Sequence, residues 1–133
     1  MRWCYLLLCL LCPVSATTVV VNTSVPVDSL SQTQLRNIFS LRQTQWPDGS
    51  AIRVLVLPDG SDTHQQFSRK QLRLFPYQLN TIWDKHSFSG TGRRPQQVES
   101  AAAMLEALSA TPGAIGYLQQ LTPVMGIKEV HIE

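Results

Sequence analysis

The sequence predicts a single α/β domain with one mixed sheet flanked by helices. Stretches rich in β-branched residues alternate along the chain with stretches whose apolar residues recur at helical spacing, a pattern typical of α/β folds. The length of 133 residues is enough for one domain but not for two. An apolar fraction of 44% and a charged fraction of 15% are typical of a chain that buries a core.

The first 16 residues are predicted to be a signal peptide. Arg2 supplies the positive charge, and the uncharged apolar run Trp3–Cys12 is shorter than a membrane span. The small residues of Val14-Ser15-Ala16 predict cleavage after Ala16, which leaves a mature domain at residues 17–133. We therefore expect a periplasmic protein with no membrane span after signal removal.

Cysteine placement bears on both anchoring and stability. Lipid attachment at Cys12 is the alternative to simple cleavage, but Leu11 stands where lipoprotein signals carry a small residue. Cys4, Cys9 and Cys12 all lie in the leader. The mature domain is thus expected to fold without a disulfide.

Four segments are expected to form strands, because β-branched and apolar residues dominate them. The second ends at Pro58, which cannot donate to a strand ladder. The expected strands are Thr17–Asn22, Ile52–Leu57, Ala114–Leu118 and Ile127–Ile132.

Four helices are expected between these strands. Ser31 and Gln34 have capping-box spacing at the start of the first, and Pro76 fits the first turn of the third. Thr63–Leu74 is expected to form the second, and Gln96–Ala110 the fourth. In that fourth helix, Leu105 is expected to face the core.

A turn and a helix start follow the strand Ile52–Leu57. Pro58-Asp59-Gly60 ends the strand, and Ser61-Asp62-Thr63 opens a helix in which Asp62 and Gln65 have capping-box spacing. Such a helix start directs backbone N–H groups toward one point, where an anion can bind. The alternative is a well-capped helix with no ligand.

The same stretch resembles the periplasmic phosphate-binding proteins of the type II solute-binding class. Asp59-Gly60-Ser61 and Thr63, followed by Phe67, match their strand–turn–helix motif, while Leu57 replaces a phosphate-clamping arginine and Asp62 replaces a glycine. Further matches are Leu30-Ser31, Ile38-Phe39, Trp46, Asp48-Gly49, Ile52, Trp83, Phe88-Ser89-Gly90 and the closing motif Thr111-Pro112-Gly113-Ala114-Ile115-Gly116-Tyr117.

The resemblance implies a single lobe of a fold that normally has two lobes around a cleft. It implies a binding module related to ABC-transporter substrate-binding proteins, with phosphate or another small oxyanion at Ser61, Asp62 and Thr63, no cofactor and no enzymatic activity. Because Leu57 and Asp62 both weaken an anion clamp, we expect weak or altered binding. The alternative is a protein–protein interaction module of a cell-envelope assembly.

Other candidate residues have competing interpretations. His64 could assist an anion when protonated or could be an exposed helix residue. Ser61 lacks the flanking glycines of a nucleophile elbow. Arg93-Arg94 could contact an anion or simply face water. Trp46 and Trp83 are read as packing residues. A net charge of +2 with no basic stripe argues against nucleic-acid binding, and no ligand spacing indicates a metal site.

Overall fold

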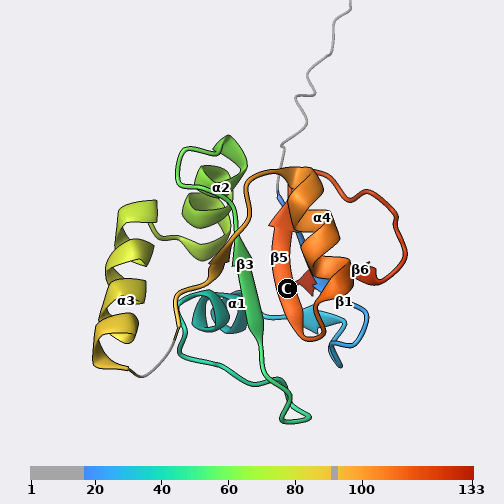
Figure 1. Cartoon of the computed structure of the whole chain (residues 1–133), viewed down its shortest axis with the longest axis horizontal. Helices are drawn as coiled ribbons and strands as arrows, with labels where there is room; N and C mark the ends of the chain where they lie inside the picture. Colours follow the sequence, from blue (N-terminus) through green and yellow to red (C-terminus); the bar gives the residue numbers. More distant parts are fainter. Residues whose placement is uncertain (1–16, 91–92) are drawn as a thin grey trace, which may run out of the picture.

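A five-stranded mixed sheet forms the centre of the molecule (Figure 1). The computed structural model describes residues 17–90 and 93–133. From one edge to the other, the strands are β4 (Gln96–Gln97), β3 (Arg53–Val56), β5 (Ala114–Leu118), β1 (Thr18–Asn22) and β6 (Ile127–Glu129). β3 runs parallel to both its neighbours, whereas β1 is antiparallel to β5 and β6. This confirms the predicted mixed sheet.

The last predicted strand, Ile127–Ile132, is wrong as a single strand. It divides at Val130 into β6 and β7 (His131–Ile132), and β7 pairs in parallel with β2 (Ser29–Leu30) in a separate small sheet. The Val130 N–H donates to the Val19 carbonyl at 2.9 Å, and the His131 N–H donates to the Asp28 carbonyl at 3.0 Å. The chain thus changes hydrogen-bonding partner between these two residues.

The helices are α1 (Gln32–Phe39), α2 (Asp62–Gln66), α3 (Pro76–Ser89) and α4 (Ala101–Ala110), with a π-helix, η1 (Phe67–Leu72), directly after α2. The predicted capping box at α1 is confirmed. The Gln34 N–H donates to Ser31 Oγ at 3.1 Å, and the Ser31 N–H donates to Gln34 Oε1 at 2.8 Å. α3 begins at Pro76, as expected for proline in a first turn.

The predicted helix Gln96–Ala110 begins too early. Its first two residues form β4 beside Leu55 and Val56 of β3, and helix α4 begins only after Ser100, whose side chain caps it. The expected core face is confirmed in part, because Leu105 packs against the core but is only half-buried, whereas Met104 and Leu108 are fully buried. Alanines flanking these residues left the helix face ambiguous in the sequence.

Two adjacent residues of β5 show how helices cover both faces of the sheet. A Cβ added at Gly116 would lie 2.6 Å from Met104 Sδ, so α4 packs closely on that face. The next residue, Tyr117, points to the opposite face, as alternation along a strand requires. Its ring stacks on Phe67 of η1 at 4.0 Å between centroids and lies 6.1 Å from Phe39 of α1.

The closing motif also forms a tight turn before β5. Gly113 has a φ of +80°, and a Cβ there would lie 2.4 Å from the Ala51 carbonyl oxygen, so only glycine fits. The Trp46 indole N–H donates to the Gly113 carbonyl at 3.0 Å, and that of Trp83 donates to the Phe39 carbonyl at 2.8 Å. Both tryptophans are buried, which confirms their packing role.

The predicted signal peptide, residues 1–16, lies outside the described residues. Within residues 17–90 and 93–133, none of the helices combines the length and apolar character that a bilayer crossing requires.

Candidate functional site

The predicted anion site lies where β3 leads into α2. Ser61 is the N-cap residue of α2, and its Oγ accepts the His64 N–H at 3.2 Å. The predicted capping box of Asp62 and Gln65 is therefore wrong, because the helix begins one residue earlier than that spacing assumes. The Gln65 side chain instead donates to the Asp59 carbonyl at 3.1 Å, across the turn.

The structure brings the three predicted ligand-binding residues to the first turn of this helix. Asp62 is exposed, while Ser61 and Thr63 are half-buried. The Thr63 hydroxyl donates to Gln119 Oε1 at 3.2 Å, just beyond β5. Because the cap engages the His64 N–H, the N–H groups of Asp62 and Thr63 are the ones left without a partner inside the helix.

Leu57 does not reach this site. Its side chain is 5% exposed and belongs to the hydrophobic core. The position where the phosphate-binding pattern carries an arginine therefore presents no group to a ligand. The Leu57 N–H donates to Tyr117 Oη at 2.9 Å. The backbone at this position is therefore tied to β5.

His64 is buried, with 1% of its surface exposed, so the interpretation as an exposed helix residue is wrong. Its Nδ1 is hydrogen-bonded to Tyr117 Oη. Since Tyr117 accepts from Leu57, we assign the phenolic proton to this bond, which places the proton of the neutral imidazole on Nε2. Burial lowers the pKa of His64 and raises the pKa of Tyr117 above its usual value.

Asp59 sits at the outer end of this chain of contacts. Its Oδ1 is 3.6 Å from His64 Nε2, and its Oδ2 accepts from the Asn80 amide at 2.6 Å. The His64 Nε2 atom is buried and has no hydrogen-bond partner among the described residues. A chain of contacts thus connects the turn before α2 to the centre of the sheet, through Asp59, His64, Tyr117 and Leu57.

This arrangement does not resemble a nucleophilic site. Ser61 Oγ contacts the backbone N–H of His64, while the imidazole ring is engaged by Tyr117. Ser61 therefore has no ring nitrogen at hand to take its proton, as a serine nucleophile requires. Within the described residues, no group of three or more His, Cys, Asp or Glu side chains is placed to hold a metal ion.

The second candidate anion contact, Arg93-Arg94, lies elsewhere. The Arg94 guanidinium forms an ion pair with Asp84 and stands 5.7 Å from the centre of the Trp83 ring. It also donates to Asn80 Oδ1 at 3.3 Å. Arg94 is therefore held against α3, so neither predicted interpretation describes it fully.

Comparison with protein families identifies the domain type. The family model of the PBP superfamily domain matches residues 11–123. The chain belongs to this family. The match confirms the resemblance inferred from the turn at Ser61 and from the closing motif Thr111–Tyr117. Comparison with curated proteins yields no match.

Solved structures share the fold of this PBP-type domain. A protein from Clostridium perfringens assigned to the phosphate ABC transporter substrate-binding proteins, solved with bound phosphate, aligns with a TM-score of 0.72 at 17% identity over 88% of this chain and 44% of its own. An ABC-type phosphate transport receptor from Vibrio cholerae aligns with a TM-score of 0.64 at 17% identity, over 88% of this chain and 46% of its own. PstS from Borrelia burgdorferi aligns with a TM-score of 0.63 at 16% identity, over 88% of this chain and 47% of its own. The chain spans less than half of each of these proteins.

Proposed function

We propose that this PBP-type domain is an exported, periplasmic binding module that holds phosphate or a similar small oxyanion weakly at Ser61, Asp62 and Thr63. The observation that carries the proposal is the capped start of α2 directly after β3, in a fold shared with phosphate-binding proteins. The ligand would accept the N–H groups of Asp62 and Thr63, and the hydroxyls of Ser61 and Thr63 could rotate toward it.

Electrostatics support weak binding. The exposed Asp62 carboxylate lies in the first turn of α2, and the Asp59 carboxylate lies in the preceding turn. Like charges a few ångström apart repel by about 1 kcal/mol in water. With Leu57 buried in the core, this site has no arginine in the position where the phosphate-binding pattern places one.

The test is calorimetric titration of the mature domain with phosphate, sulfate and acetate. Asp62→Asn removes the repulsive charge and should tighten phosphate binding by roughly fivefold, which corresponds to about 1 kcal/mol. Glu106→Gln on α4 makes the same charge change away from the site and should leave the dissociation constant unchanged. Ser61→Ala combined with Thr63→Val should weaken binding. If neither the natural domain nor Asp62→Asn binds any oxyanion at millimolar concentration, the proposal is wrong.

The alternative is an interaction module of a cell-envelope assembly. It is favoured by the buried Leu57 and by the exposed Asp62, which leave the helix start without an anion clamp. In that case the fold would be used for protein contacts without a small ligand. Failure of every oxyanion titration, together with retained folding, would favour this alternative.

A further inference from the structure

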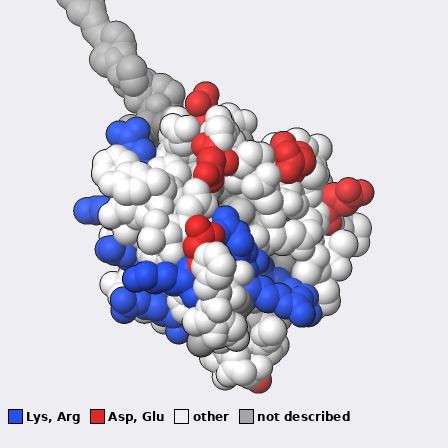
Figure 2. Space-filling view, turned by 60° about the vertical axis from the view of Figure 1, so that its left-hand side comes forward, with Lys and Arg blue, Asp and Glu red and all other residues white. Residues whose placement is uncertain are grey.

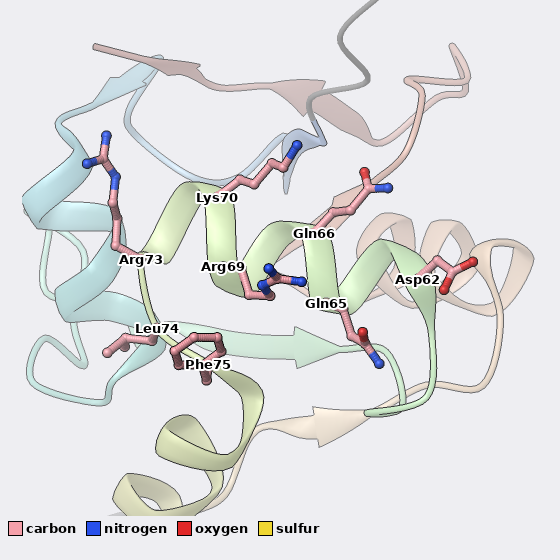
Figure 3. A pocket seen from close by; sticks show the side chains of 8 residues that line it. All are labelled: Asp62, Gln65, Gln66, Arg69, Lys70, Arg73, Leu74 and Phe75. Carbon is pink, nitrogen blue, oxygen red and sulfur yellow. The ribbon is translucent and has the colours of Figure 1, made fainter.

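Cationic and aromatic side chains gather on the exposed side of η1 and the turn before α3 (Figure 3). An open hollow there is lined by Arg69, Lys70, Arg73 and Phe75. We call these four residues, together with Tyr77, the basic surface. Phe75 is 50% exposed and Tyr77 68%, and their rings stack with centroids 5.7 Å apart. The Arg69 guanidinium lies 5.8 Å from the centre of the Phe75 ring.

The positive charge of the basic surface is not neutralised within the described residues. None of the ion pairs found there involves Arg69, Lys70 or Arg73. Arg73 also lines a second hollow together with Arg36 of α1. Figure 2 shows Lys and Arg gathered over the left and lower part of the face drawn, with Asp and Glu above, to the right and also beside basic groups near the centre. Unpaired cations at this density attract a partner of opposite charge.

Gln65 indicates which kind of anionic partner fits. It is exposed, lines the same hollow and uses a side-chain N–H on the Asp59 carbonyl, so its amide oxygen faces solvent as an acceptor. A peptide backbone offers an N–H donor at every residue except proline, whereas a phosphodiester offers only acceptors.

We propose that the basic surface binds an extended, acidic peptide segment of a partner protein, in which acidic and apolar side chains alternate. In an extended chain this alternation places the acidic groups on one side and the apolar groups on the other. The acidic side chains pair with Arg69, Lys70 and Arg73, and the apolar ones pack on Phe75 and Tyr77. Aromatic and arginine side chains together are typical of the residues that dominate interface energies.

Asp62 argues for a peptide rather than an anionic membrane. It lines the hollow at the end opposite to Arg73, so the charge of this surface changes sign along α2 and η1 (Figure 3). A uniformly anionic bilayer would be repelled at Asp62, whereas a peptide can place a neutral or basic residue there. This inference gives the interaction module its surface and does not depend on an oxyanion at Ser61.

The experiment measures binding of a fluorescein-labelled peptide of about a dozen residues, with Asp and Glu alternating with Phe and Leu, by fluorescence anisotropy. A matched peptide carries Asn and Gln in place of the acids. We expect the acidic peptide to bind the mature domain at least tenfold more tightly. Raising NaCl from about 0.1 M to about 1 M shortens the Debye length from about 10 Å to about 3 Å and should weaken that binding.

The variant Arg69→Glu with Lys70→Glu should weaken acidic-peptide binding at least tenfold. Arg42→Glu with Arg53→Glu makes the same change in net charge outside the basic surface and should change it less than twofold. Tyr77→Ala, at an exposed position, provides a second variant that keeps the charge and should also weaken binding. Unfolding midpoints of all variants establish that they fold.

Several results would overturn the inference. One is equal affinity for the acidic and neutral peptides, or no binding of either by the natural domain. Another is unchanged binding by folded Arg69→Glu with Lys70→Glu. A third is binding of vesicles of equal parts phosphatidylserine and phosphatidylcholine, or of an oligo-dT strand, in place of the acidic peptide. Phosphate titration of Tyr77→Ala separates this surface from the oxyanion site, because the oxyanion site should keep its affinity for phosphate in this variant.

Discussion

Removing one hydroxyl group, by Tyr117→Phe, tests the buried chain of contacts behind the candidate site. The Tyr117 hydroxyl accepts the Leu57 N–H at 2.9 Å and is bonded to His64 Nδ1. Both partners are buried, so water cannot replace the lost hydroxyl. The phenylalanine ring keeps its stacking on Phe67, which isolates the loss to the hydrogen bonds.

The expected cost follows from the two groups left unpaired. Each buried polar group without a partner costs about 1–3 kcal/mol. Two such groups give a loss of roughly 2–6 kcal/mol in the free energy of unfolding, against a typical total of about 5–15 kcal/mol. The loss should therefore be a large fraction of the stability of the domain.

Urea unfolding with linear extrapolation measures this loss. The matched control is Tyr77→Phe, which removes the same hydroxyl from a side chain that is 68% exposed and should change stability by less than about 0.5 kcal/mol. The slope with denaturant should stay the same for both variants. If Tyr117→Phe is as stable as Tyr77→Phe, the buried contacts do not hold the turn before α2, and our reasoning about this site fails.

Two further predictions concern the same core. Burial lowers the pKa of His64 in the folded state, so the unfolded chain takes up a proton first as pH falls below about 6.5, and the stability of the domain should decrease there. Urea unfolding from pH 8 to pH 5 measures this decrease. The variant His64→Asn keeps an acceptor for Tyr117 and should lose less stability over this range than the natural domain. Met104→Ala should lower the free energy of unfolding by about 2–5 kcal/mol because Met104 is fully buried, whereas Leu105→Ala should lower it clearly less because Leu105 is half-buried. Equal losses in thermal or urea unfolding would mean that α4 is rotated from its orientation in this structure.

Local sequence determined several features of this protein. The Ser31–Gln34 capping box, the proline start of α3 and the bounds of β5 depend on neighbouring residues in the chain, and each was predicted correctly. The closing motif carries part of the resemblance to the family, and its Gly113 meets a local demand for a positive φ.

Tertiary structure alone decided the surroundings of the candidate site. His64 and Tyr117 are 53 residues apart, and no local pattern indicates that they meet. The position of Leu57 in the core, the pairing of β4 with β3, and the gathering of Arg73 and Arg36 beside one hollow likewise depend on how distant segments pack. Periodicity and capping describe interactions within a few residues, whereas burial and charge density arise only when the sheet brings separate elements together.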